Sequence, residues 1–344
     1  MSSTKAQPNS IANETMSLEA KVMRLYNEFG QRKPIGQPAE DTRHPHYFLH
    51  RTFLGEQDLL IIFNTKRCRY QCYFCDLPLK STRAWVTTED ILAQFEYVLD
   101  ELKHSLSVLD RLTLSNEGSV LDIDTFPEDA MLTIARCAKE LRRIRTLVLE
   151  TRLEFVDPIY IKQVKEADPR ATINILTGFE TRDPYIRDEI LYKQESLDMF
   201  LGGLDKVGES GADLTAYVLY KPSPNMTDKD AFIEAEDSIN YLVEQCRRRG
   251  IPLTVRLNPM YAARRSRWAK IARTTPEYKP PRLSDVLRLA VKKASEGVKI
   301  YVGLSTEGLE EPWGNYIVRE DYSQELLKQA ILFNSGKRSD FSSL

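Results

Sequence analysis

The sequence predicts an α/β protein whose core is a partial or full (β/α) barrel of about six to seven parallel strands, with a short N-terminal helical extension. Three observations support this fold. Apolar runs of strand length recur along the chain, segments of helical length separate them, and the runs are apolar on both faces. Such runs are typical of a parallel sheet built from βαβ units. An open doubly wound sheet is the competing fold, and it differs in strand order, which a sequence does not show.

The runs and segments define the expected elements in chain order. Strands are expected at 58–64, 111–115, 146–150, 172–178, 214–220, 253–257 and 299–304. Helices are expected at 88–104, 127–142, 157–167, 183–207, 228–249 and 283–296. Thr87 or Thr88 precedes acidic residues, which gives the first of these helices an N-cap.

Four segments are expected along the chain. Residues 1–16 are polar and are expected to be disordered, while residues 17–56 are expected to form an N-terminal helix and a segment that caps one barrel end. The barrel is expected to occupy residues 57–305, followed by a C-terminal extension over 306–344.

Composition is that of an ordinary soluble globular protein. The 344 residues are 42% hydrophobic and 28% charged, and no apolar run approaches the roughly 18 residues of a membrane helix. The N-terminus lacks the apolar core of a secretory signal, so we expect a cytoplasmic protein with no membrane partner. The net charge of −2 gives no overall field that attracts nucleic acid, and five cysteines do not suggest a disulfide framework.

Three of the five cysteines are crowded into one short stretch, "RCRYQCYFCD". Cys68, Cys72 and Cys75 follow the first expected barrel strand, and the loops at this end of a barrel carry the active site. A closed zinc site needs four ligands. Cys137 and Cys246 lie among apolar residues of expected helices, so we expect them to be buried hydrophobes. Three thiolates fit a 4Fe–4S cluster with one open iron, and a zinc knuckle with a distant fourth ligand is the alternative.

The spacing C-x3-C-x2-C, with an aromatic residue before the last cysteine, resembles the radical S-adenosylmethionine (radical SAM) superfamily. Three further segments, 115–122 (SNEGSVLD), 149–157 (LETRLEFVD) and 177–183 (TGFETRD), resemble the branch that contains the Elongator catalytic subunit. The stretch "RLNPMY…YKPPRLSDVLRLA" is similar to archaeosine-synthase-type relatives. Leu153 departs from the pattern, because this branch usually has proline there.

The resemblance implies cofactors and site residues. Cys68, Cys72 and Cys75 would hold the 4Fe–4S cluster, SAM would bind its open iron, and an electron from a flavodoxin or ferredoxin type of donor would cleave SAM to a 5′-deoxyadenosyl radical. No catalytic residue is identified. The SAM contacts that the resemblance implies are Phe74, Asn116, Glu117, Gly118, Ser119, Glu150, Arg152, Glu180, Lys193 and Lys221.

Each of these assignments has a structural alternative. Residues 116–119 also fit a tight turn with a glycine. Glu150 ends an apolar strand, where a carboxylate needs a partner, either a ribose hydroxyl or Arg152. Lys193 would pair with the SAM carboxylate or be a solvated helix lysine, and Lys221 points either to the barrel mouth or to solvent.

Two other features have open interpretations. His44, His46 and His50 precede the barrel without a cysteine or acid cluster, so we expect a capping segment or a substrate contact. The tract 261–282 holds seven Lys/Arg against one Glu, interleaved with Tyr261, Trp268 and Tyr278. Basic residues with stacking aromatics bind phosphates and bases, although a charge run is often only a solvated face.

The predicted function is that of a radical SAM enzyme acting on a small metabolite, such as a nucleoside, sugar or amino-acid derivative, in a biosynthetic pathway. A tRNA-modifying radical SAM enzyme is the first alternative, and the lack of an evident appended RNA-binding domain favours the small molecule over it. A non-catalytic zinc- or cluster-binding interaction protein is the alternative from another class.

Overall fold

The computed structural model describes residues 41–75, 81–141, 143–260, 265–304 and 323–336, together with residues 17, 20, 23, 33 and 34. The expected disordered segment 1–16, most of the expected N-terminal helix and much of 306–344 lie outside the described residues. Within the described part, no helix combines the length and hydrophobicity that crossing a membrane requires.

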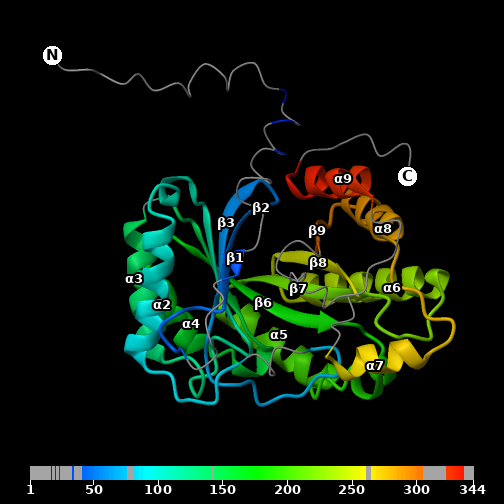
Figure 1. The fold of residues 1–344 in the computed structure, drawn as a ribbon, viewed down its shortest axis with the longest axis horizontal. Helices are drawn as coiled ribbons and strands as arrows, with labels where there is room; N and C mark the ends of the chain where they lie inside the picture. The colour runs from blue at the N-terminus through cyan, green and yellow to red at the C-terminus, as the bar shows by residue number, and fades with distance from the viewer. Residues whose placement is uncertain are drawn as a thin grey trace.

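One sheet runs through the molecule, and its described strands follow one another in sequence order (Figure 1). The first three strands pair antiparallel and β3 to β9 pair parallel. Their bounds are β1 Lys33–Pro34, β2 Tyr47–Phe53, β3 Glu56–Phe63, β4 Arg111–Asn116, β5 Thr146–Glu150, β6 Thr172–Glu180, β7 Asp213–Tyr220, β8 Leu253–Pro259 and β9 Lys299–Val302. A doubly wound sheet reverses its strand order at a switch point, so the sequential order confirms the partial α/β barrel. All seven predicted strands are present, and β2, which sequence analysis did not expect, lengthens the sheet at its antiparallel edge.

The helices lie around the outside of the curved sheet (Figure 1). They are α2 Thr88–Glu101, α3 Glu128–Glu140, α4 Pro158–Ala167, α5 Leu197–Ser210, α6 Asp228–Arg248, α7 Arg267–Thr274, α8 Leu283–Ser295 and α9 Gln324–Asn334, with short turns η2 Leu106–Val108, η3 Leu153–Phe155 and η4 Ile186–Ile190. The predicted N-cap at Thr87 is confirmed, because its side chain accepts from the Asp90 amide. The single helix predicted at 183–207 is wrong: a π-helical turn, η4, and α5 flank a non-helical segment.

The two faces of the sheet differ in polarity. Alternate residues such as Leu59 and Leu112 pack into the main core with the helices. On the inner face, Tyr47, Leu49, Leu60 and Ile62 form a small buried apolar cluster on β2 and β3. Other strands carry polar residues there, and the buried Asp58 accepts from Arg51 (2.9 Å) and Thr113 (2.7 Å). The expectation that both faces are apolar therefore holds for β3 and is wrong for strands such as β4 and β8. A polar interior suits the binding of a polar ligand better than a packed core does.

Two adjacent glycines in helix α5, Gly202 and Gly203, allow the packing of this helix to be tested. A Cβ atom on Gly203 would overlap Leu153 of η3, whereas one on Gly202 would meet nothing within 4 Å. We expect Gly203→Ala to lower the free energy of unfolding by about 1–3 kcal/mol. Gly202→Ala should raise it by up to about 1 kcal/mol, because alanine favours the helix. Urea unfolding of both variants measures the difference, and equal effects at the two positions would contradict this packing.

Candidate functional site

The cysteine loop, residues 64–75, lies where the carboxyl ends of the parallel strands meet. It follows β3, and the next loop in the sheet, 116–122, follows β4. A Cβ atom on Gly118 would lie 3.4 Å from the Cys68 Cβ and 3.6 Å from its Sγ. The second loop thus lies directly beside Cys68, within van der Waals contact of a side chain at position 118.

A second segment, Leu191–Gln194 after η4, holds the same loop from the other side; we call it the support segment. The Tyr73 amide donates to the Leu191 carbonyl (2.8 Å), and the Gln71 amide donates to the Gln194 side chain (3.2 Å). The Tyr73 and Tyr192 rings stack with centroids 4.7 Å apart. Tyr192 and Gln194 have φ angles of 47° and 55°, a left-handed conformation that costs about 1–3 kcal/mol and persists only where surroundings enforce it.

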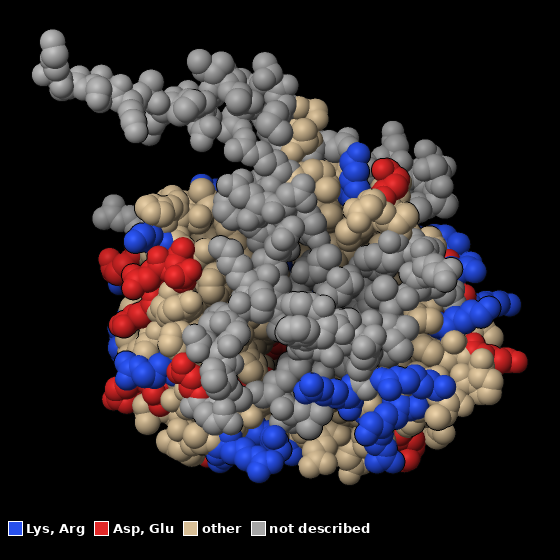
Figure 2. Space-filling view, in the orientation of Figure 1, with Lys and Arg blue, Asp and Glu red and all other residues tan. Residues whose placement is uncertain are grey.

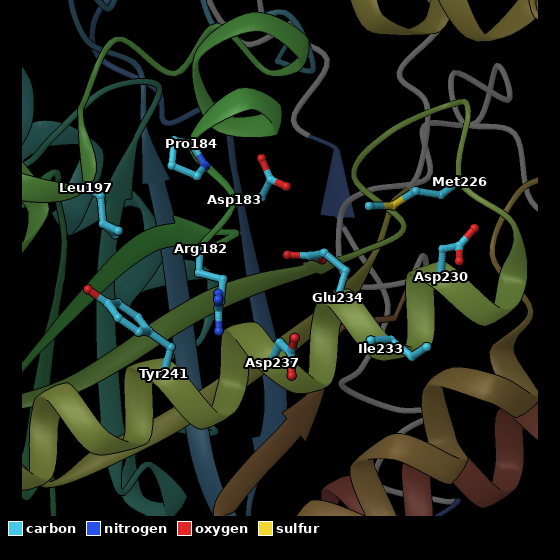
Figure 3. A pocket seen from close by; sticks show the side chains of 10 residues that line it. All are labelled: Arg182, Asp183, Pro184, Leu197, Met226, Asp230, Ile233, Glu234, Asp237 and Tyr241. Carbon is cyan, nitrogen blue, oxygen red and sulfur yellow. The ribbon is translucent and has the colours of Figure 1, made fainter.

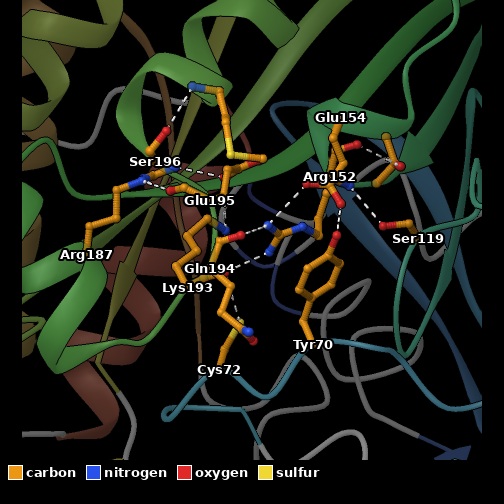
Figure 4. A network of polar contacts seen from close by, with 12 residues as sticks. Tyr70, Cys72, Ser119, Arg152, Glu154, Arg187, Lys193, Gln194, Glu195 and Ser196 are labelled. Carbon is orange, nitrogen blue, oxygen red and sulfur yellow. Dashed lines mark hydrogen bonds and ion pairs between the residues drawn. The ribbon is translucent and has the colours of Figure 1, made fainter.

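Arg152 joins the support segment to the cysteine loop (Figure 4). Its guanidinium donates to the carbonyls of Lys193 and Gln194, both at 2.9 Å, and lies 3.7 Å above the Tyr70 ring. The Arg152 amide donates to Ser119 Oγ (3.0 Å). These donors bond to the protein itself and link the two segments, whereas the buried Nε of Arg152 has no hydrogen-bond partner within the described residues.

Four buried charged residues, Glu180, Arg187, Lys193 and Glu195, lie at the end of β6 and in and around the support segment. Lys193 Nζ lies 3.4 Å from Glu180 and 3.7 Å from Glu195, which also pairs with Arg187 (2.7 Å). Burial raises the pKa of Glu180, and the nearby Lys193 and Arg187 oppose that rise. A Cβ on Gly178 would overlap the Glu180 carboxylate. Lys193 is therefore buried, and its alternative interpretation as a solvated helix lysine is wrong.

The predicted residues of the β4 loop are also buried. Asn116 Oδ1 accepts from the Gly118 amide (2.8 Å), while its Nδ2 has no hydrogen-bond partner within the described residues. The Glu117 side chain is fully buried and pairs with His46. Sequence analysis missed this pair, because nothing in the sequence relates the two residues. Phe74 is half-buried and packs against the cluster that contains Trp268.

Glu150 and Lys221 have partners that the sequence did not indicate. The Tyr217 hydroxyl bonds to Glu150, and burial together with this carboxylate raises the pKa of Tyr217 far above its ordinary value. Of the two partners expected for Glu150, Arg152 is thus the wrong one, since it turns to the support segment. Lys221 is buried and pairs with Asp228 at the start of α6 (2.7 Å), so it does not extend into solvent.

Tyr217 and its neighbours in the sheet belong to the polar interior. Gly178, Tyr217 and Arg256 stand side by side on β6, β7 and β8. Arg256 donates to the Tyr217 hydroxyl (3.5 Å). Tyr217 and Asn258 are partly exposed, although they lie on β7 and β8 within the sheet. Polar residues at alternate strand positions were the sequence signal for this set.

The three cysteines are free and half-buried, and they fit an iron–sulfur cluster. Burial raises the pKa of the Cys68 and Cys72 thiols, and positive side chains oppose it, chiefly Arg152 at Cys68 and Lys193 at Cys72. Within the described residues, no three His, Cys, Asp or Glu side chains are grouped as ligands of one metal ion. A cluster gives each thiolate its own iron, so it does not need that convergence.

The other two cysteines lie on helices outside the sheet. Cys246 is buried in the main core, and Cys137 is half-buried on α3 and packs against that core. The prediction of a buried hydrophobe is confirmed for Cys246, whereas Cys137 is only half-buried.

A pocket of about 600 Å³ lies between the β6 loop and α6, and none of the three cysteines lines it (Figure 3). Its walls combine carboxylates with apolar side chains such as Ile233. Burial raises the pKa of Glu234, whose carboxylate accepts from Ser238 (2.6 Å) and Thr181. The carboxylate is thus held by the protein itself, and we assign this pocket no role.

Comparison with known proteins gives distant relatives. No protein-family model matches the chain. It is 22% identical over 292 residues to an uncharacterized protein of Methanocaldococcus jannaschii, a match that covers 82% of this chain and 77% of that protein. It is 24% identical over 186 residues to archaeosine synthase subunit beta of Thermococcus kodakarensis, covering 53% of this chain and 57% of that subunit. In sequence, the chain resembles an archaeosine synthase subunit. This confirms the resemblance to archaeosine-synthase-type relatives that the sequence motifs indicated.

Solved structures with partial similarity include two lyases. One is a queuine lyase from Clostridium spiroforme bound to SAM and queuine, with 14% identity, a TM-score of 0.44 and coverage of 74% of this chain and 95% of that one. The other is a spore photoproduct lyase mutant with a dinucleoside spore photoproduct, with 15% identity, a TM-score of 0.47 and coverage of 75% and 77%.

Hydrogen exchange can test whether Arg152 holds the cysteine loop against the support segment. Arg152→Lys keeps the charge but loses the planar fork of donors. Hydrogen bonds to charged groups contribute about 1.5–3 kcal/mol each. Amides of residues 69–75 should therefore exchange about tenfold faster or more. Arg170→Lys, whose arginine pairs with Asp168 outside the site (3.1 Å), is the control and should leave this segment unchanged. Equal protection in both variants would contradict the assignment.

Proposed function

We propose that the chain is a radical SAM enzyme that acts on a small polar metabolite inside the barrel. The observation that carries the proposal is the cysteine loop, held between the β4 loop and the support segment at the carboxyl ends of the strands. Cys68, Cys72 and Cys75 would hold a 4Fe–4S cluster, which supplies the electron that cleaves SAM when it is bound. The chain's own residues orient SAM and exclude water from it.

The charged and polar side chains beside the cysteine loop match the polar groups of SAM. SAM carries a carboxylate, an amine and a ribose diol, and each needs a polar partner in a buried site. Lys193 would bind the carboxylate, and Glu180 would accept from the ribose once Lys193 turns to SAM. Asn116 Nδ2, without a partner within the described residues, would donate to the methionine group. The motifs that resemble the radical SAM superfamily supply two of these three residues, Glu180 and Asn116.

The polar interior supports a small substrate. Glu150 bonds to Tyr217, and Glu150, Tyr217 and Asn258 are all partly exposed, so they would offer a carboxylate, a hydroxyl and an amide to a substrate. A nucleoside, sugar or amino-acid derivative has the hydroxyl and amine groups that such a set would bind. The radical formed from SAM would then meet its substrate in the interior, away from water.

The cluster assignment has a direct test in iron content. Cys68→Ala, Cys72→Ala and Cys75→Ala should each lose iron and sulfide after anaerobic reconstitution, while Cys137→Ala and Cys246→Ala keep both. The unmutated protein, reduced with dithionite in the presence of SAM, should release 5′-deoxyadenosine and methionine. Full iron in any of the first three variants, or stoichiometric zinc in place of iron, would refute the proposal.

Modification of a tRNA base is the second candidate, favoured by one surface feature and one similarity. Trp85, which follows the cysteine loop in sequence, is 62% exposed, and Lys66 lies 5.4 Å from its ring centroid. An exposed aromatic ring beside a cation offers a base a place to stack. The similarity to archaeosine synthase subunit beta supports the same substrate class, although the match spans only about half of this chain.

Titration with bulk tRNA separates the two candidates. The metabolite proposal predicts no binding at low salt beyond that of a control protein of equal charge. A tRNA enzyme would bind, and its log affinity would fall linearly with log salt concentration. On single strands the slope is about −0.7 for each phosphate contact. Trp85→Ala would then weaken binding about tenfold, since stacking contributes about 1–3 kcal/mol per base. Ile159→Ala on α4, where the side chain is 71% exposed, is the control.

A further inference from the structure

Helix α7 lies directly against the cysteine loop, and sequence analysis did not expect it as a helix. The Trp268 amide donates to the Tyr73 carbonyl (2.7 Å), and the Arg267 guanidinium lies 3.9 Å from the Tyr73 ring centroid. Tyr73 stands between Cys72 and Cys75 in the loop. The Trp268 ring nitrogen donates to the Pro222 carbonyl (2.8 Å), which fixes the helix to the loop after β7. Helix α7 thus covers the outer side of the cysteine loop.

The two faces of α7 differ sharply. Trp268, Ala269 and Ala272 are buried in a cluster that also includes Leu191 of the support segment. The opposite face carries exposed cations around an apolar centre, Ile271, which is 41% exposed. The exposed cations on and beside the helix are Arg265, Arg267, Lys270, Arg273 and Lys279. Figure 2 shows Lys and Arg side chains gathered over α7, in a chain whose net charge is −2.

The proposed function requires an electron from outside the protein. In reductive cleavage, a donor is oxidised by one electron, the bond between the SAM sulfur and its C5′ breaks, and the products are methionine and a 5′-deoxyadenosyl radical. The donor must come close to the cysteine loop and leave again after each electron. Small, charged interfaces suit such short-lived redox complexes, and charge complementarity raises their rate of formation.

We propose that the exposed basic face of α7 is the docking surface for an acidic one-electron donor protein, such as a flavodoxin. The inference rests on the proposed function. Ile271 would give the contact its apolar centre, and Lys270 and Arg273 would pair with carboxylates at its rim. The backbone contact between Trp268 and Tyr73 places the docked partner against the loop that would hold the cluster.

RNA is a weaker match to this face. A base-stacking surface needs exposed aromatic rings. Trp268, one of the aromatics that made the tract 261–282 resemble such a surface, is fully buried. Tyr278 is half-buried, and its ring contacts the Trp268 ring edge to face at 5.4 Å. Tyr261 lies outside the described residues. The cations of α7 surround the aliphatic side chain of Ile271, and the nearby Tyr73 ring is half-buried and already contacted by Arg267 and Tyr192.

The test compares two reductants in two variants. Lys270→Glu with Arg273→Glu reverses two exposed cations on α7, and Arg136→Glu with Lys139→Glu makes the same change with the same spacing on α3. SAM cleavage is measured as 5′-deoxyadenosine, driven either by dithionite or by a purified flavodoxin kept reduced by its reductase and NADPH. At low salt, we expect the flavodoxin-driven rate of the α7 variant to be at least about tenfold lower than that of the unmutated protein. The variant's rate should also lose its dependence on salt concentration. Its dithionite-driven rate and both rates of the α3 variant should match those of the unmutated protein.

Each other outcome has a defined meaning. An unchanged flavodoxin-driven rate in the α7 variant overturns the docking proposal, and loss of tRNA binding instead assigns the face to RNA. If the α7 variant also loses dithionite-driven cleavage, Lys270→Gln with Arg273→Gln replaces it, and the same contrast between reductants decides. If the unmutated protein does not cleave SAM with dithionite, the proposed function fails. Calorimetric titration of reduced flavodoxin against both variants then decides docking by itself: equal affinities overturn it.

Discussion

The geometry of the candidate site depends on the buried guanidinium of Arg152. Its two hydrogen bonds to the carbonyls of Lys193 and Gln194 contribute about 1.5–3 kcal/mol each, because the donor is charged. That is comparable to the roughly 1–3 kcal/mol that each left-handed residue of the support segment costs. The same guanidinium lies on Tyr70 of the cysteine loop. Together with the contacts of Tyr73 and Gln71 to the support segment, this side chain therefore links the loop and the segment.

The fold explains why these parts meet. In a parallel sheet of sequential strand order, the loops after β3, β4, β5 and β6 emerge side by side at one edge. Each loop contributes one part of the site: the cysteines, Gly118, Arg152 and the support segment with Lys193. The outer face of the sheet is filled by the apolar core with the helices. The inner face is thereby left free to carry polar groups such as Glu150 and Tyr217.

The sequence predicted the strands and the cysteine loop well, and the reasons are local. Each strand is a compact apolar run, and the cysteine spacing is contiguous. The burial of Lys193 was not predictable, because it depends on a π-helical turn and on partners from β6. The same holds for Trp268: an aromatic residue in a basic tract indicated an exposed surface, but the apolar cluster beneath α7 buries it. Long-range pairs such as Glu117 with His46 leave no local signal.

The central claim is that the three cysteines hold an iron–sulfur cluster against which SAM binds. The most direct test is a crystal structure from anaerobically grown crystals with SAM, with anomalous scattering recorded on both sides of the iron edge. The account predicts an iron signal within bonding distance of the sulfurs of Cys68, Cys72 and Cys75, and a SAM methionine group between Gly118 and Lys193. A zinc signal at the cysteines, or SAM bound away from an iron signal, would contradict it.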